Sequence, residues 1–189
     1  MSWSKVAAVL AAVVVLAAPV SGFASDGDSE FGRSGPYVSG SAMYGFENFS
    51  GKAADPTPDN SWGYNLRGGY RFNEYFALEA LWEQYVDFKN GGDNGSTDQW
   101  IGALNAKVYP FDGLVQPYVA AGLGWWQVND DRPANGDDSG LGVRFGLGLD
   151  FYLSRNWALT TEVGYLLPTG GGSDYQVIPL SLGVIYRFY

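Results

Sequence analysis

The 189-residue chain is long enough for one domain, is rich in aromatic residues (13 Tyr, 11 Phe, 7 Trp) and glycine (27), and has a formal net charge of -9. It contains no Cys and no His, which excludes disulfides, thiolate or imidazole metal sites, cysteine nucleophiles and every catalytic triad that uses histidine. The negative charge argues against nucleic acid as a partner, and the aromatic and glycine content favours strands and tight turns over helices.

The beginning of the chain predicts a secretory signal peptide. Lys5 is followed by an apolar run, residues 6–18, that is too short to span a bilayer as a helix. Gly22-Phe23-Ala24 matches a small-x-Ala cleavage site. We therefore expect a signal peptide at 1–24, an acidic periplasmic lead-in at 25–35 and a single folded domain at 36–189.

The folded domain contains eight segments of strand length. In residues 62–72, WGYNLRGGYRF, every second residue from Trp62 is apolar except Gly68, whereas Arg67 and Arg71 share the other parity. This period of two indicates a strand with one apolar face. The first and fifth segments leave the parity open, because small residues and aromatics occur on both faces. The eight segments are 36–46, 62–72, 76–88, 100–110, 117–128, 141–152, 157–167 and 176–188.

The connections between these segments alternate between long and short. Short links require antiparallel neighbours, and an even number of strands with all long links at one end is typical of an up-and-down barrel. Transmembrane barrels have this asymmetry, with short periplasmic turns and long external loops. The sequence therefore predicts an all-β fold, an eight-stranded antiparallel up-and-down transmembrane β-barrel.

The charged residues of the segments predict a polar interior. Charges that share one segment are separated by even steps, so they fall on one face, while aromatic residues such as Trp62 and Trp157 lie near the ends of the opposite face. Apolar bands with aromatic ends face lipid, whereas a soluble barrel points its apolar side chains inward. We expect the charges to form a lumen network, in which Glu79 and Glu83 pair with arginines and do not act as a catalytic dyad. The ten charges are Arg67, Arg71, Glu79, Glu83, Asp87, Lys107, Arg144, Asp150, Glu162 and Arg187. The expected partners of the two glutamates are Arg67, Arg71 and Arg187.

Four stretches carry a resemblance to a known family. They are PYVSGSAMYGF, RFNEYFALEAL, PYVAAGLGW and the final SLGVIYRF. The chain resembles the small eight-stranded outer-membrane barrels, the OmpA-like or OmpX-like porin family. The resemblance implies outer-membrane localisation and insertion by the barrel assembly machinery, which would read Gly183, Tyr186 and Phe188 as an assembly signal. Tyr189 departs from the family pattern, which usually stops at the phenylalanine.

The expected function follows from the interior and the loops. Eight strands enclose a space that side chains fill, so we expect a plugged lumen, no catalysis and no cofactor. The long loops carry ten acids against three basic residues, a net charge of -7, and contact with lipopolysaccharide or divalent cations competes there with plain solvation. The acids are Glu47, Asp55, Asp59, Asp93, Asp98, Asp130, Asp131, Asp137, Asp138 and Asp174.

The first hypothesis is that the protein is a monomer in outer-membrane lipid and has a structural or surface-interaction role. A narrow, weakly cation-selective channel is the second hypothesis. A soluble periplasmic binding barrel is the third.

Overall fold

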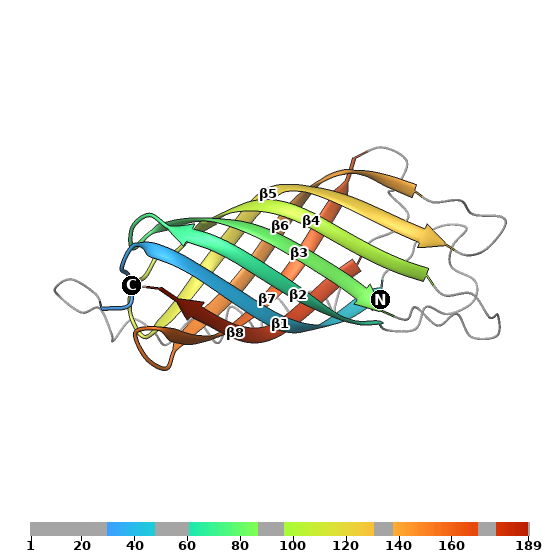
Figure 1. The fold of residues 1–189 in the computed structure, drawn as a ribbon. Helices are drawn as coiled ribbons and strands as arrows, with labels where there is room; N and C mark the ends of the chain where they lie inside the picture. The colour runs from blue at the N-terminus through green and yellow to red at the C-terminus, as the bar shows by residue number, and fades with distance from the viewer. Residues whose placement is uncertain (1–29, 48–60, 87–96, 131–137, 170–176, 189) are drawn as a thin grey trace, which may run out of the picture.

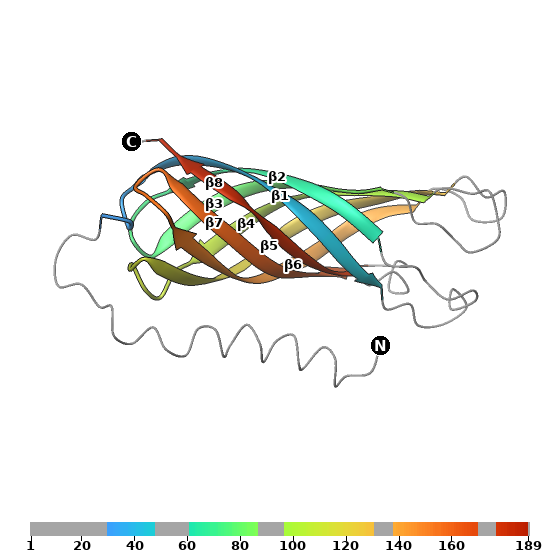
Figure 2. The same ribbon diagram turned by 90° about the horizontal axis from the view of Figure 1, so that it is seen from below.

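The structure is a closed antiparallel β-barrel, in which each strand pairs with its neighbours in the sequence and β8 pairs with β1 (Figures 1 and 2). This confirms the predicted fold. The computed structural model describes residues 30–47, 61–86, 97–130, 138–169 and 177–188. The strands are β1 Gly35–Glu47, β2 Ser61–Arg71, β3 Phe76–Val86, β4 Thr97–Val108, β5 Val115–Asp130, β6 Asp138–Tyr152, β7 Trp157–Pro168 and β8 Val177–Arg187.

Short connections close three hairpins at one end of the barrel, which we call the turn end; the opposite end is the loop end. In the β2–β3 turn the Asn73 Oδ1 atom accepts hydrogen bonds from the backbone N–H groups of Tyr75 (2.9 Å) and Phe76 (2.8 Å). In the β6–β7 turn the Ser154 Oγ atom accepts from the N–H of Trp157 at 3.1 Å. Asn and Ser side chains bond the backbone in this way in tight turns, so the local sequence accounts for the short links.

At the loop end β4, β5 and β6 are longer than predicted. They begin or end at Thr97, Asp130 and Asp138, beyond the predicted limits of 100, 128 and 141. The extra residues, 97–99, 129–130 and 138–140, are all polar or glycine, so they add no apolar alternation to the pattern. An alternating pattern marks a strand only where its two faces meet different surroundings. The predicted extension of β3 to residue 88, which includes Asp87, lies outside the described residues.

The outer surface of the barrel is apolar. Among the described residues 27 large hydrophobic side chains are exposed, with Leu104 at 71%, Leu123 at 69% and Leu182 at 66%. Aromatic pairs stand near both ends of this band, with ring centroids 5.0 Å apart for Tyr44–Trp62 at the loop end. Because leaving one such side chain in water costs about 1.5–3 kcal/mol, this surface requires apolar surroundings.

The structure settles the parity of the two ambiguous strands. In β1 Tyr37 and Met43 are buried and point inward, and in β5 Tyr118 and Trp126 do the same. Large aromatic residues therefore occupy the interior as well as the outer face. Among the described residues, no helix is long and apolar enough to cross a membrane.

Candidate functional site

The candidate site is the polar interior of the barrel. The structure places nine of the ten predicted charged side chains there, the tenth, Asp87, being outside the described residues, and the most exposed of the nine, Arg67, is only 5% exposed. The nine are Arg67, Arg71, Glu79, Glu83, Lys107, Arg144, Asp150, Glu162 and Arg187. They come from β2, β3, β4, β6, β7 and β8, so the site exists only when the barrel is closed.

Glu162 is the centre of the network. Its carboxylate accepts two hydrogen bonds from Arg67, at 2.8 Å and 3.0 Å, which is a bidentate pair. It also accepts one from Arg144 Nη2 at 2.8 Å and one from the Tyr118 hydroxyl at 2.9 Å. One carboxylate on β7 therefore ties together β2, β5 and β6 across the interior.

The other two glutamates lie on β3 and extend the network. Glu79 accepts hydrogen bonds from the Tyr37 hydroxyl at 2.9 Å and from Arg67 and Lys107 at 3.4 Å each. Glu83 accepts one from Arg144 Nη2 at 2.7 Å. Each carboxylate thus has its own cations, which leaves the pair poorly suited to share a proton as a catalytic dyad.

Arg71 was expected to pair with the glutamates, but its hydrogen bonds within the described residues go to other groups. Arg71 lies opposite Ala77 in the β2–β3 register, and Glu79 is two residues, or about 7 Å, further along β3 toward the loop end. Arg71 therefore donates to Gln116 Oε1 at 2.6 Å and to the backbone oxygen of Asn73 at 3.0 Å. Its guanidinium group also lies 4.0 Å from the centre of the Tyr109 ring.

Asp150 belongs to the same turn-end layer. It accepts hydrogen bonds from the Thr160 hydroxyl at 2.7 Å and the Tyr109 hydroxyl at 3.1 Å. Lys107 lies between this layer and the glutamates, with its ammonium group 3.8 Å from the centre of the Tyr118 ring. The neutral aromatic side chains fill the space between charges that do not meet directly.

Residues directly before β1 lie against the turn end of the interior. The Phe31 ring packs on Tyr152 with centroids 5.3 Å apart. Arg187, at the end of β8, donates to the backbone oxygens of Phe31 and Arg33 and to the Tyr152 hydroxyl. The sequence had indicated only an acidic lead-in at 25–35. Phe31 is the one signal that could have suggested more, because it is a large apolar residue among small and polar neighbours.

Two matching rows of residues build the network from opposite sides of the barrel. In one row, the register places Tyr37 opposite Gly69 and Gly69 opposite Glu79. In the other, Tyr118 is opposite Gly148, and Gly148 is opposite Glu162. In both rows the tyrosine ring lies over the glycine, and its hydroxyl reaches the glutamate at 2.9 Å.

These rows have a signal in the sequence that the alternation of apolar residues did not reveal. The tripeptide Pro-Tyr-Val occurs at both 36–38 and 117–119, at the start of the two strands that supply the tyrosines. Glycine is required opposite each tyrosine because the ring occupies the space of a Cβ atom. A search for repeated pairs of tyrosine and glycine would have found the rows.

Replacing Gly69 with alanine should destabilise the barrel. A Cβ atom at this position would lie 2.5 Å from Tyr37 Cζ and 2.7 Å from the backbone oxygen of Leu78. Such overpacking costs about 1–3 kcal/mol. Gly68→Ala is the matched control, because no atom lies within 4 Å of a Cβ added there. Urea unfolding of both variants in lipid vesicles tests this prediction, and equal unfolding free energies would contradict it.

The three residues of the predicted assembly signal lie on β8 or directly after it. Gly183 is opposite Ser41 of β1 and in close contact with it. Tyr186 and Phe188 share the outward parity of β8, and Tyr186 stacks edge-on against Trp157 at 4.8 Å and against Phe188 at 4.9 Å. Within the described residues, no group of Asp, Glu, His or Cys is arranged to hold a metal ion.

Comparison with known proteins identifies the family. A family model described as an outer membrane protein beta-barrel domain matches residues 8–188. The chain belongs to this family. Outer membrane protein A of Klebsiella aerogenes is 28% identical over 142 residues, which cover 70% of this chain and 41% of that protein. The chain spans less than half the length of the curated relatives with which it aligns.

Solved structures of outer-membrane barrels have the same fold. Neisserial surface protein A superposes with a TM-score of 0.66 at 17% identity, covering 81% of this chain and 97% of that chain. Ail of Yersinia pestis superposes with a TM-score of 0.61 at 20% identity, covering 82% of this chain and all (100%) of that chain. This outer-membrane barrel protein therefore lies in the outer membrane, as predicted, and its apolar band faces lipid. The soluble binding barrel is excluded.

Proposed function

We propose that this outer-membrane barrel protein has a plugged interior and acts as a structural or surface-interaction protein, without catalysis. The observation that carries the proposal is the bonding of Glu162, whose single carboxylate joins strands on opposite sides of the interior. Side chains that cross a narrow lumen in this way leave little space for solutes. Glu79 and Glu83 are each ion-paired with their own cations, which disfavours a role as a catalytic base.

A narrow, weakly cation-selective channel is the competing function. Liposome swelling distinguishes the two, because it reports the entry of small sugars and amino acids through a reconstituted protein. The native barrel is expected to give no swelling above empty liposomes. The double variant Arg67→Ala and Glu79→Ala removes two interior side chains of opposite charge and is expected to admit solutes. The plugged interior would be contradicted if liposomes with the native protein swelled as fast as liposomes with this variant.

The long loops are the proposed contact surface. The predicted loops carry ten acidic residues against three basic ones, a net charge of -7. The structure places Glu47, Asp98, Asp130 and Asp138 at strand ends, and the other six acids lie outside the described residues. Ail of Yersinia pestis has been crystallised with the heparin analogue sucrose octasulfate, a polyanion. Acidic loops would repel such a ligand, so we propose contact with lipopolysaccharide through bridging divalent cations instead.

The loop proposal predicts binding that depends on a divalent cation. The barrel in nanodiscs should bind lipopolysaccharide when the buffer contains about 1 mM Mg²⁺, a concentration in the range at which weak extracellular cation sites are occupied. It should release the lipopolysaccharide when EDTA is added. Changing Asp130, Asp131, Asp137 and Asp138 to asparagine should weaken the binding. Glu74→Gln at the turn end is the control. Binding that survives both EDTA and the loop changes would contradict the role of the acidic loops.

A further inference from the structure

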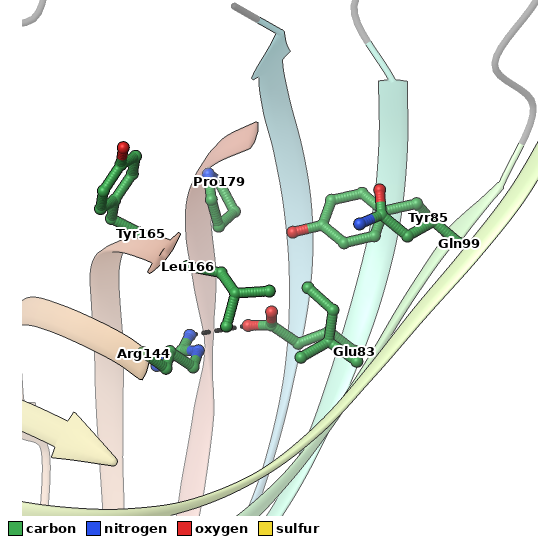
Figure 3. Close-up of a pocket in the computed structure, with 8 residues that line it drawn as sticks. Glu83, Tyr85, Gln99, Arg144, Tyr165, Leu166 and Pro179 are labelled. Atoms are coloured by element: carbon green, nitrogen blue, oxygen red, sulfur yellow. Dashed lines mark hydrogen bonds and ion pairs between the residues drawn. The ribbon is translucent and has the colours of Figure 1, made fainter. Parts of the chain in front are cut away.

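The two ends of the barrel interior differ. At the loop end, Figure 3 shows a small pocket lined by Tyr85, Leu166 and Pro179, next to the ion pair of Glu83 and Arg144. This pocket has room for about one water molecule. At the turn end, residues 30–34, directly before β1, lie against the interior. We call residues 30–34 the clasp.

Gly35 turns the clasp away from the barrel wall. It is the first residue of β1 and lies opposite Arg71 of β2. Its φ angle is 155°, a backbone conformation that residues with a Cβ atom rarely adopt. Before this turn, Glu30 forms an ion pair with Arg155 of the β6–β7 turn, although β8 and β7 stand between β1 and β6 in the barrel. The clasp therefore runs from β1 across the turn end toward the β6–β7 turn.

Arg187 of β8 bonds the clasp from the side of the last strand. Its side chain is buried, and its guanidinium group donates to the backbone oxygens of Phe31 and Arg33. Asn156 fixes the backbone of Arg187, because the two residues exchange two hydrogen bonds of 2.8 Å each. Since the bonds from Arg187 to the clasp end on backbone oxygens, they depend on the path of the clasp and not on the side chain at position 33.

The contacts of the clasp with β8 can form readily only after the barrel has closed. Phe31 and Arg187 are 156 positions apart in the chain, so joining them in an open chain costs the entropy of closing a long loop. Pairing of β1 with β8 places Tyr37 opposite Arg187, and Phe31 lies shortly before Tyr37 in the chain. The bonds from Arg187 to the clasp are then local and no longer require closure of that loop.

We infer that the clasp is a conformational device that slows reopening of the closed barrel between β1 and β8. Separation of these strands at the turn end requires Arg187 to leave its two backbone acceptors in the clasp. Interactions that form after the transition state of folding raise the barrier to unfolding and leave the folding rate nearly unchanged. The inference goes beyond the proposed function, because it concerns the turn end and requires neither a plugged interior nor contact at the loops.

The first test compares the unfolding and refolding rates of the full-length barrel in lipid vesicles, followed by tryptophan fluorescence. Phe31→Ala removes the ring that packs on Tyr152 and should loosen the clasp. It should raise the unfolding rate about tenfold and leave the refolding rate within about twofold of the native value. Arg33→Lys is the matched control, because it keeps the backbone oxygen that Arg187 bonds, and should leave both rates unchanged.

Trypsin cleavage after residue 33 reports whether the clasp is in place in the folded barrel. The Arg33 side chain is exposed, but its backbone oxygen is bonded to Arg187, so cleavage of the native barrel in nanodiscs should be slow. Cleavage follows the population of the opened segment, so Phe31→Ala should speed it about tenfold. Arg33→Lys keeps a trypsin site and should be cleaved slowly.

Three results would each overturn the inference. Phe31→Ala could leave the unfolding rate at the native value, which would show that the clasp does not oppose reopening. It could slow refolding as much as it speeds unfolding, which would place the clasp contacts before closure. Trypsin could cut the native barrel after Arg33 as fast as it cuts the Phe31→Ala variant, which would show that the clasp is open in the folded protein.

Discussion

Replacing Glu162 with alanine is expected to lower the unfolding free energy of the barrel by about 3–5 kcal/mol. The loss follows from what the carboxylate leaves behind. The side chains of Arg67 and Arg144 are only 2% exposed, and without Glu162 their positive charges would stay buried with weaker partners. Urea unfolding in lipid vesicles measures the loss, and heat-modifiable migration on gels gives an independent readout of the folded fraction.

Two further variants separate charge from size at this position. Glu162→Gln keeps the shape and one acceptor, so its loss should fall between those of the native protein and the alanine variant. Glu74→Ala removes an exposed carboxylate from the β2–β3 turn but keeps the backbone oxygen of residue 74, to which Arg71 donates. It should therefore change the unfolding free energy by no more than about 0.5 kcal/mol. A loss for Glu162→Ala as small as that for Glu74→Ala would contradict the central place of Glu162.

Replacing Tyr186 and Phe188 together with alanine is expected to remove most of the barrel from the outer membrane of cells. Both side chains point outward, and their ring contacts are with each other and with Trp157. They bond no interior group, so the barrel refolded in vesicles should keep most of its unfolding free energy. The assembly-signal hypothesis therefore predicts a large loss of cellular yield with a small loss of stability. Outer-membrane yield equal to that of the native protein would contradict it.

Gly183→Ala is the informative comparison, because this residue has a second, structural role. A Cβ atom at position 183 would lie 2.3 Å from the backbone oxygen of Gly40 and 2.2 Å from Ser41 Oγ. It would therefore strain the β1–β8 pairing that closes the barrel, at about 1–3 kcal/mol. We expect Gly183→Ala to lower both yield and unfolding free energy. A loss of yield alone would assign Gly183 to the signal and not to packing.

The strands were predictable because the barrel has two very different surroundings. Lipid outside and a polar interior impose an alternation that continues through most of each strand, as in residues 62–72. The alternation fails where the residues of both faces are polar. The extensions of β5 to Asp130 and of β6 to Asp138 consist of polar residues and glycine, so they carried no apolar pattern.

The pairing of the interior charges was less predictable than their location. Parity places a residue on a face but gives no height along the barrel, and height decides which charges meet. Arg71 and Arg187 share the interior with the glutamates but lie nearer the turn end, where backbone oxygens and Tyr152 bond them. Inward tyrosines were equally hidden, because Tyr37 and Tyr118 suit either face by composition.

Single-channel recording in planar bilayers tests the central claim most directly, which is that paired side chains fill the interior. The native barrel is expected to give no reproducible conductance steps, because the three carboxylates and three cations bond each other across the lumen. Reproducible steps from the native protein that grow when Arg67 is changed to alanine would contradict the claim, since they would show ions already passing that residue.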